Sequence, residues 1–373
     1  MLSLKILNFY IIIFTATLLS ASSKKAIRIL SFFFLTIIAG IRYNSGRDYM
    51  NYYQIYLENA SGSTRFLNNE FGFYYLMKIL NNLGVSYNSL LMLIAIFLLF
   101  TIYICFFRNY SKIYMGIFIF LVIEKLYFNI IAGSAIRQGI AIGFFILAVE
   151  NYLNRKIIKY LIFCYIAILF HRSAIIGVFI PAIFLISKAF FKYIPLIATS
   201  LVIFHRYFIM ILIFILNILN LDEYSKAYLQ VESSSDKMSI IKIIYYMLFI
   251  FQYYFLYYNF SKLEGRRIKK YAKLLLIGMI INFLLISNIG IFHRILPYFQ
   301  IYYIPILLSF KYNRKVKKIY FIIFFLFLFI GNHLKQVMSK TELSKYYIYY
   351  QTFFGKDLKK DLERWRLEEE RIN

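Results

Sequence analysis

Residues 29–53 read ILSFFFLTIIAGIRYNSGRDYMNYY, and this stretch decides the class of fold. Its first half, residues 29–41, is almost wholly apolar, whereas its second half begins at Arg42 and carries a further arginine and an aspartate. Arginine is costly to bury in lipid, so a membrane helix should end where the polar half begins. The stretch therefore predicts a transmembrane helix followed by a polar segment that has a use outside the bilayer.

The rest of the chain repeats the apolar pattern. Apolar residues make up 61% of the sequence, and the mean hydropathy is +0.67. A helix needs about 20 apolar residues to cross the hydrocarbon core, and somewhat fewer when its ends snorkel. About twelve segments qualify, which predicts an all-α fold, a polytopic integral membrane helix bundle. The expected spans are residues 4–21, 29–43, 88–107, 113–132, 138–152, 157–170, 173–187, 193–219, 239–259, 272–291, 295–310 and 319–331.

The formal net charge of +26 comes from lysines and arginines that fall mostly in the short gaps between apolar runs. Cytoplasmic loops of membrane proteins collect such residues, so topology explains the charge and no nucleic-acid partner is expected. The pattern places both termini outside the cytoplasm if residues 193–219 form one helix. Two short helices there, around His205 and Arg206, would reverse the membrane orientation of every later segment. Cys105 and Cys164 lie inside apolar runs without metal-ligand spacing, so neither a disulfide framework nor a metal site is expected.

The expected organisation is one membrane domain, residues 1–331, with a long outer loop at 44–87. Within that loop, residues 70–83 are too short and too polar to span, and we expect an amphipathic helix that lies in the membrane interface. Residues 332–373 are expected to form an extracytoplasmic amphipathic tail, surface-bound or solvated. The loop residues expected to face lipid are Phe71, Tyr74, Tyr75 and Leu76, and the tail residues at helical spacing are Leu358, Leu362 and Trp365.

Five polar clusters fall, on this topology, at the outer ends of different helices. An arginine fork matches phosphate oxygens, so several arginines around one pocket can hold a lipid-linked diphosphate and stabilise a leaving pyrophosphate. A carboxylate or imidazole within hydrogen-bond reach can take a proton from an attacking hydroxyl. Four residues stay open as this base, namely Asp48, Glu70, His171 and His293. The clusters are Arg42 with Gly46, Arg47, Asp48 and Tyr49; Glu70 with Gly72; Arg137 with Gln138; His171 with Arg172; and His293 with Arg294.

Each cluster also has a structural explanation. Arginine and tyrosine at helix ends are ordinary interface anchors, and the tyrosine-rich stretch at 52–56 is more typical of an aromatic belt than of a sugar-binding platform. His171, between two apolar runs, fits a helix cap about as well as a catalytic base. For Arg137 the surrounding sequence favours a functional role. The small residues of IAGSAIRQGIAIG let helices approach closely, so the arginine would face protein and not lipid headgroups.

Four blocks of the sequence resemble the EpsG family of membrane proteins, the Wzy-like polymerases of bacterial exopolysaccharide, capsule and O-antigen. The pattern RYxxGxDY is moderately specific, and RQ followed about thirty residues later by FHxSA strengthens it. The blocks appear in the family's order and cover most of the chain from Arg42 to Pro305, whereas the tail beyond Thr341 matches no pattern. The blocks are RYNSGRDYMNYYQIY from Arg42, NEFGFYYLMKIL from Asn69, IRQGIAIGFFILAVENYLNRKIIKYLIFCYIAILFHRSAII from Ile136 and HRILPYFQIYYIP from His293.

The resemblance implies a GT-C-like glycosyltransferase on the extracytoplasmic, periplasmic side of the bacterial cytoplasmic membrane, without metal or cofactor. The donor would be a growing glycan on undecaprenyl pyrophosphate, and the acceptor a single lipid-linked repeat unit. The transfer would be inverting or retaining. The implied partners are these two glycolipids and the bilayer, with a chain-length regulator and a flippase as further candidates.

By position, the resemblance assigns pyrophosphate binding to Arg137, Arg172 and Arg294, and the shaping of the sugar site to Arg42 and Asp48. His171 is the first candidate for the base and Asp48 the second. The remaining site candidates are Arg47, Tyr49, Glu70, Gln138 and His293.

Three other functions compete with a polymerase. A ligase that moves finished glycan from the same lipid donor would use similar arginines. A flippase or other transporter of lipid-linked oligosaccharide would carry charges deep within several spans, and only Glu124, Lys125, His205 and Arg206 come close. A structural subunit of a polysaccharide assembly would use the arginines for anionic headgroups.

Overall fold

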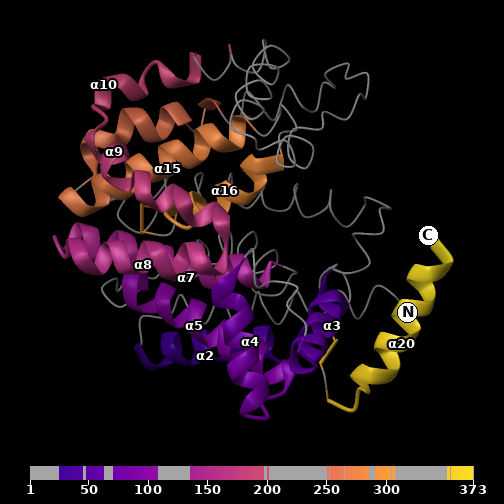
Figure 1. Ribbon diagram of the computed structural model, residues 1–373. Coiled ribbons are helices and arrows are strands. Elements are labelled where there is room, and N and C mark those ends of the chain that lie inside the picture. Colours follow the sequence, from indigo (N-terminus) through magenta and orange to yellow (C-terminus); the bar gives the residue numbers. More distant parts are fainter. Residues whose placement is uncertain are drawn as a thin grey trace, which may run out of the picture. The chain divides into compact units, whose positions relative to one another are not determined.

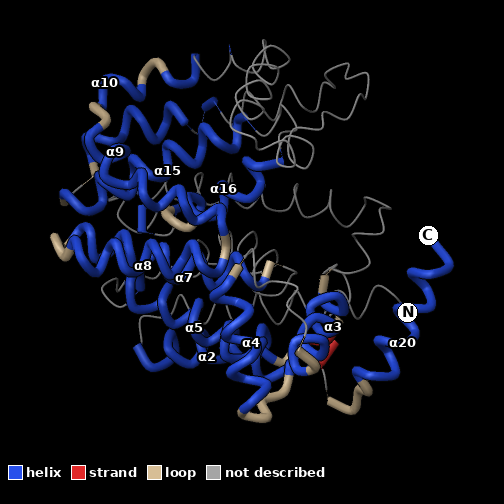
Figure 2. Tube along the Cα trace, in the orientation of Figure 1, coloured by secondary structure: helices blue, strands red, loops and turns tan. Residues whose placement is uncertain are grey.

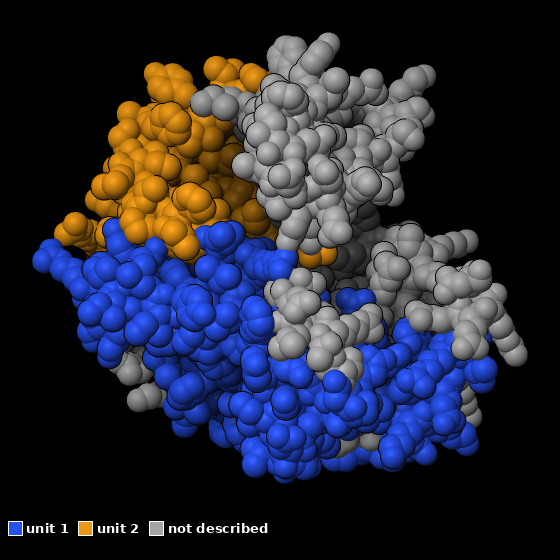
Figure 3. Space-filling model, in the orientation of Figure 1, with its two compact units in different colours: residues 1–175, 311–373 blue, residues 176–310 orange. Residues whose placement is uncertain are grey.

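A computed structural model of the protein is shown in Figures 1 and 2. Among the residues that it describes, the regular structure is helical apart from one pair of two-residue strands. These residues form two compact units, residues 1–175 with 311–373 and residues 176–310, which are described in turn (Figure 3). The described residues are 25–44, 48–62, 70–107, 135–196, 200, 250–251, 253–263, 265–284, 290–303, 305–306, 351–352 and 354–372.

Four apolar helices of the first unit pack in series, each on the next, in the order α2, α5, α7 and α8. Helices α5 and α7 approach closely at Gly143, where a Cβ atom would lie 2.4 Å from Cε1 of Phe97. This agrees with the expected role of small residues around Arg137. The bounds are α2 (Lys25–Gly40), α5 (Tyr87–Ile102), continued by the π-helix η1 (Tyr103–Phe107), α7 (Ile136–Leu153) and α8 (Ile157–Phe170).

These helices match the spans expected at 88–107, 138–152 and 157–170. The span expected at 29–43 was placed too far along the chain, because α2 ends at Gly40 and residues 42–43 form a short strand. Within the described part of the chain, two helices, Tyr87–Phe106 and Ile136–Leu153, are long and apolar enough to cross a membrane, or three if one bent pair counts as a span. A bundle with membrane-spanning helices is therefore supported, while the total of about twelve stays a prediction. The expected spans that lie wholly outside the described residues are 4–21, 113–132 and 319–331.

The loop between α2 and α5 folds into two short helices that pack on each other, α3 (Tyr49–Ala60) and α4 (Phe71–Asn82). Their contact with α5 is built from tyrosines, because Tyr49, Tyr53 and Tyr56 surround Tyr87 at ring-centroid distances of 5.4, 5.4 and 5.8 Å. All four rings are at least 94% buried by protein, since none is more than 6% exposed. An aromatic belt is therefore wrong for these tyrosines, which form a folding core.

Helix α4 has the amphipathic character expected of residues 70–83. Phe71, Tyr75, Ile79 and Leu83 follow one another at four-residue spacing and are 46–71% exposed. Such a stripe of exposed apolar side chains suits contact with lipid at the membrane interface. The expectation fails for Tyr74, which is 7% exposed and faces protein, and for Leu76, which is partly buried against the same core.

The C-terminal segment returns to the start of the loop between α2 and α5. Strand β1 (Arg42–Tyr43) pairs antiparallel with β2 (Gln351–Thr352), the two red strands of Figure 2. Helix α20 (Leu358–Ile372) then packs on α3, with the side chain of Leu362 4% exposed in the tyrosine core. The Tyr43 hydroxyl donates a hydrogen bond to the Asp361 carboxylate, and burial together with this carboxylate raises the pKa of Tyr43. The tail is therefore a docked element and is not simply solvated.

Replacing Leu362 with alanine is expected to loosen α20 by about 2 kcal/mol, the low end for truncating a buried leucine, because the helix docks at the edge of the core. Hydrogen exchange of residues 358–372 measures the effect, and faster exchange confined to this helix is expected. Leu367→Ala is the matched control, since Leu367 lies on the same helix and is 57% exposed. Equal exchange in the two variants would show that Leu362 does not anchor the helix.

In the second unit, α15 packs on both α9 and α16. The chain bends by 111° between the helical stretches Arg172–Leu185 and Lys188–Leu196. Lys273 of α15 holds this bend, because its Nζ donates to the carbonyl oxygens of Phe184 at 2.8 Å and Ile186 at 2.6 Å. The bounds are η3 (Arg172–Phe179), which begins in the first unit, α9 (Ile180–Leu185), α10 (Lys188–Phe191), η4 (Phe260–Lys262), α15 (Arg266–Leu284) and α16 (Gly290–Gln300).

Helix α16 differs from the sequence-based expectation of a turn near residues 292–294. It begins at Gly290 and runs through His293 and Arg294, with Pro297 inside it. The polar pair interrupts the apolar run without breaking the helix, because histidine and arginine are both compatible with a helix interior. The turn predicted near residues 292–294 from polarity alone is therefore wrong, because the backbone there is helical.

Candidate active site

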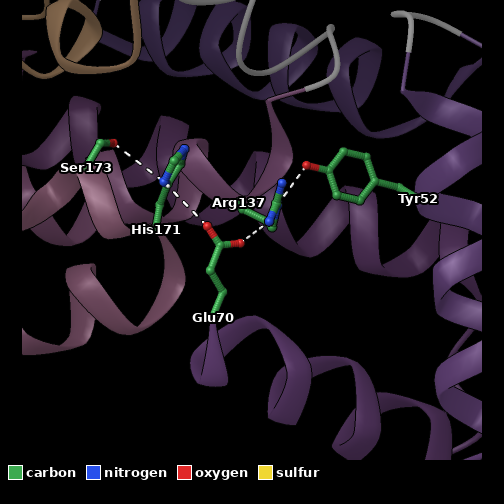
Figure 4. A network of polar contacts seen from close by, with 5 residues as sticks. All are labelled: Tyr52, Glu70, Arg137, His171 and Ser173. Carbon is green, nitrogen blue, oxygen red and sulfur yellow. Dashed lines mark hydrogen bonds and ion pairs between the residues drawn. The ribbon is translucent and has the colours of Figure 1, made fainter. Parts of the chain in front are cut away.

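Arg137 lies in the first turn of α7, directly after the small residues that precede this helix. Its side chain has two described partners (Figure 4). The Nε donates to the Tyr52 hydroxyl oxygen at 2.9 Å, and Nη1 donates to Oε2 of the Glu70 carboxylate. The guanidinium carbon also lies 5.5 Å from the centre of the Tyr52 ring. Arg137 thus joins α3, α4 and α7.

Glu70 stands at the N-terminus of α4 and its side chain is 7% exposed. A carboxylate is favourable near the first turn of a helix because the helix dipole is positive there. Oε2 is engaged by Arg137, while Oε1 lies 3.5 Å from Nδ1 of His171. One buried carboxylate therefore bridges an arginine and a histidine.

His171 ends α8 and takes an extended backbone conformation, with φ −156° and ψ 120°. Its amide still donates to the carbonyl of Ala167 at 3.0 Å, and its carbonyl accepts from the amide of Ala174 at 2.9 Å. The residue therefore joins α8 to η3 as the helix cap that the sequence allowed. Its imidazole, 11% exposed, also has Nδ1 3.5 Å from the Ser173 hydroxyl. Capping by the main chain leaves the ring available to the network of Figure 4.

Tyr52 completes the network from the buried face of α3. Burial raises the pKa of its phenol, although the neighbouring Arg137 lowers it, so the hydroxyl is neutral at physiological pH. The neutral hydroxyl accepts the hydrogen bond from Arg137. The ion pair of the arginine is formed with Glu70.

Gly72 brings Glu70 close to His171. A Cβ atom on Gly72 would lie 3.1 Å from the carbonyl carbon, carbonyl oxygen and Cβ of Leu169 in α8. Two of these are main-chain atoms, which cannot rotate away as a flexible side chain can. The absence of a side chain at Gly72 therefore permits α4 to pack on the end of α8, two residues before His171.

Replacing Gly72 with valine is expected to push α4 away from α8, at a cost of about 1–3 kcal/mol typical of overpacking. We expect a lower melting temperature, because the contact of α4 with α8 is disturbed, and thermal unfolding of the detergent-solubilised protein measures it. Gly72→Ala should show a smaller loss. Tyr75→Val is the control, since it adds a β-branched residue to the same helix at a position 50% exposed. An unchanged melting temperature in Gly72→Val would contradict the role of this contact.

The other candidates of the RYNSGRDY block lie near the start of α3. Arg42 is 2% exposed and its Nη1 donates to the carbonyl of Ala39 at 2.6 Å, so it binds the end of α2. Tyr49 is buried, and its hydroxyl donates to Asn88 Oδ1 at 3.2 Å. Asp48 precedes the first turn of α3 and is half-buried, while Arg47 lies outside the described residues.

The remaining candidates are distributed over both units. Gln138 is 8% exposed, next to Arg137 in α7. Arg172 begins η3 and is exposed, adjacent to His171. His293 and Arg294 belong to α16 of the second unit, where Arg294 is exposed. The structure thus joins Glu70, Arg137 and His171 in one network.

Sequence reasoning missed two members of the network. Tyr52 was treated as one residue of an aromatic stretch, and Ser173 was not weighed. Ser173 was visible as the third residue of HRS, two residues after the histidine, whereas Tyr52 had no distinguishing signal among neighbouring tyrosines. Among the described residues, no group of three or more His, Cys, Asp or Glu side chains is placed to hold a metal ion.

Comparison with known proteins gives one result that identifies the chain. The model of the EpsG family matches residues 25–352, which include every member of the network and both strands. A search of curated proteins and a search of solved structures gave no match. The match ends before α20 begins at Leu358. Because it covers most of the sequence, the protein belongs to the EpsG family.

Proposed function

We propose that this protein is a membrane glycosyltransferase that polymerises undecaprenyl-pyrophosphate-linked repeat units into O-antigen, capsule or exopolysaccharide. Membership of the EpsG family associates the chain with polysaccharide polymerisation at a membrane. The observation that carries the proposal is the network of Arg137, Glu70 and His171. Its arginine fits phosphate oxygens, its histidine is a candidate base, and the Glu70 carboxylate contacts both. The rest of the bundle, of GT-C-like architecture in this proposal, would hold the two lipid chains.

The reaction uses His171 as the general base. A hydroxyl oxygen of the acceptor sugar attacks the anomeric carbon of the donor glycan, and its proton passes to the imidazole. The new carbon–oxygen bond forms while the bond between the anomeric carbon and the pyrophosphate oxygen breaks, and undecaprenyl pyrophosphate leaves with that electron pair. Glu70 holds the imidazole through Nδ1, as a carboxylate orients the histidine in other base-catalysed transfers. Asp48 is the alternative base.

Arginines supply the charge that the leaving group needs. Arg137 would bind the pyrophosphate, and its side chain is 26% exposed, which leaves it accessible to a ligand. Arg172 and Arg294 are assigned to the same ligand, and both are exposed. Further contacts with pyrophosphate or sugar are proposed for Arg42, Arg47, Tyr49, Gln138 and His293.

The active site is proposed to lie on the extracytoplasmic, periplasmic side of the bacterial cytoplasmic membrane. Pairing of β1 with β2 supports a consistent topology, because residues 42–43 and 351–352 must then lie on the same side of the bilayer. An even number of spans must then separate the two strands. The expected spans from 88–107 to 319–331 lie between them, and they number ten. On that side the enzyme would work with the flippase that delivers lipid-linked units and a regulator of chain length.

The length distribution of the surface polysaccharide tests the function. Cells that lack the gene should carry glycan of a single repeat unit, and the wild-type gene should restore the ladder on a gel, whereas Arg137→Ala at equal abundance should not. Long polymer retained on its carrier lipid in the deletion strain would instead identify a ligase. Repeat units trapped on the cytoplasmic side would identify a flippase. Unchanged glycan would refute a role in polysaccharide synthesis.

A pair of cysteine variants tests the topology. Lys359→Cys in α20 should react with a membrane-impermeant maleimide in intact cells, because an extracytoplasmic tail is accessible from outside. Lys156→Cys, between α7 and α8, is the matched control and should react only after permeabilisation. Both lysines are exposed. Of the native cysteines Cys164 is buried and Cys105 is half-buried, so both variants carry Cys105→Ser. Labelling of position 156 in intact cells, with protection of 359, would reverse the proposed orientation.

A further inference from the structure

We propose that Glu70 is exchanged between two partners during the reaction: it holds Arg137 while the site is empty, and passes to His171 when the donor's pyrophosphate takes the arginine. This inference rests on the proposed function, since it concerns how the same site responds to its donor. In this proposal, His171 gains its full contact with Glu70, and so becomes an effective base, only when the donor is bound.

The carboxylate of Glu70 is already divided between the two partners. Oε2 forms an ion pair with Nη1 of Arg137, while Oε1 lies 3.5 Å from Nδ1 of His171, at the outer limit of a hydrogen bond. The arginine contact is therefore the stronger of the two, and the histidine contact is the longer and weaker one.

Exposure decides which partner a ligand meets. The side chain of Arg137 is 26% exposed, whereas those of Glu70 and His171 are 7% and 11% exposed. An anion that enters the site therefore reaches the arginine before it reaches the carboxylate. Pyrophosphate carries more negative charge than one carboxylate and can accept paired hydrogen bonds from a guanidinium, so it competes well for this partner.

Tyr52 provides a fixed point for the change of partner. Its hydroxyl accepts from Nε of Arg137 at 2.9 Å, and its ring centre lies 5.5 Å from the guanidinium carbon. Neither contact uses Nη1, the nitrogen that binds Glu70. A ligand can therefore displace Glu70 from Nη1 while Nε stays on the tyrosine.

The exchange has a chemical consequence at the histidine. A buried carboxylate that loses a cationic partner gains by strengthening its other contacts, because buried charge is costly unless it is well compensated. Nδ1 of His171 is 3.5 Å away, and a carboxylate bound to one ring nitrogen makes the other nitrogen a better proton acceptor. Donor binding would thus activate the base that takes the proton from the attacking hydroxyl of the acceptor.

Binding of farnesyl pyrophosphate tests the exchange, because the sign of the effect is diagnostic. The full chain in detergent, with EDTA present, is titrated as wild type and as Glu70→Gln, a variant that removes the competing charge. We expect Glu70→Gln to bind about tenfold more tightly, although it forms no polymer in cells. Glu58→Gln is the matched control, since it removes one carboxylate from α3 outside the network, and its affinity should be that of wild type.

Each other result overturns the inference in a distinguishable way. Weaker or equal binding by Glu70→Gln, with wild type binding normally, would show that Glu70 positions Arg137 for the ligand and does not compete with it. A wild-type protein that does not bind the probe would reject pyrophosphate recognition itself, and with it the proposed function. If Glu70→Gln does not fold, Glu70→Asp replaces it. Its shorter carboxylate should also release Arg137 and tighten binding, and unchanged affinity would again refute the exchange.

Discussion

Replacing His171 with alanine is expected to lower the rate of polymerisation by about 10²–10⁴-fold, the usual contribution of a positioned general base. The imidazole lies 3.5 Å from a buried carboxylate that can orient it, at the end of a helix that fixes its backbone. The measurement is the rate of chain extension in membranes supplied with lipid-linked repeat units. In cells, the glycan should stop at a single repeat unit.

A second variant and a chemical readout separate catalysis from helix capping. The cap uses main-chain atoms of His171, so alanine keeps it and the protein should remain abundant. Added imidazole should restore part of the activity of His171→Ala, because a small base can enter the space that the ring leaves. Ser173→Ala removes a hydroxyl 3.5 Å from Nδ1 and should cost far less. Full activity of His171→Ala would transfer the role of base to Asp48.

The helices could be predicted from sequence because their signal is local. An apolar run long enough to cross lipid is read within about twenty residues, and α2, α5, α7 and α8 follow such runs. The tyrosines of α3 were misplaced because composition does not distinguish a ring facing lipid from a ring facing another helix. Only the packing of α3 on α4 and α5 decides between them.

The site could be predicted only as separate pieces. Glu70, Arg137 and His171 were each recognised as polar residues at helix ends, but 67 residues separate the first two along the chain. Which helix ends meet depends on close contacts such as that of Gly72 with Leu169, which no periodicity reveals. The docking of α20 was missed for the same reason, since a mixed-charge helix with few apolar residues resembles a solvated one.

Replacing Arg137 with methionine should abolish polymerisation and also destabilise the protein, by about 2–3 kcal/mol. The loss arises because Glu70, 7% exposed, keeps a buried charge without its cationic partner. Breaking a buried ion pair costs about 3–5 kcal/mol, and the partial exposure of Arg137 lets water reduce that cost. Thermal unfolding of the detergent-solubilised protein measures the change, with Arg172→Met as the control for loss of an exposed arginine.

The double variant Arg137→Met with Glu70→Gln separates the two consequences. A neutral amide needs no cation, so most of the lost stability should return, while activity should stay absent because both the pyrophosphate ligand and the carboxylate partner of His171 are gone. Recovery of stability without recovery of function would assign the ion pair to both folding and chemistry. If the double variant were no more stable than Arg137→Met, the destabilisation would come from lost packing against Tyr52, and the charge of Glu70 would not depend on Arg137.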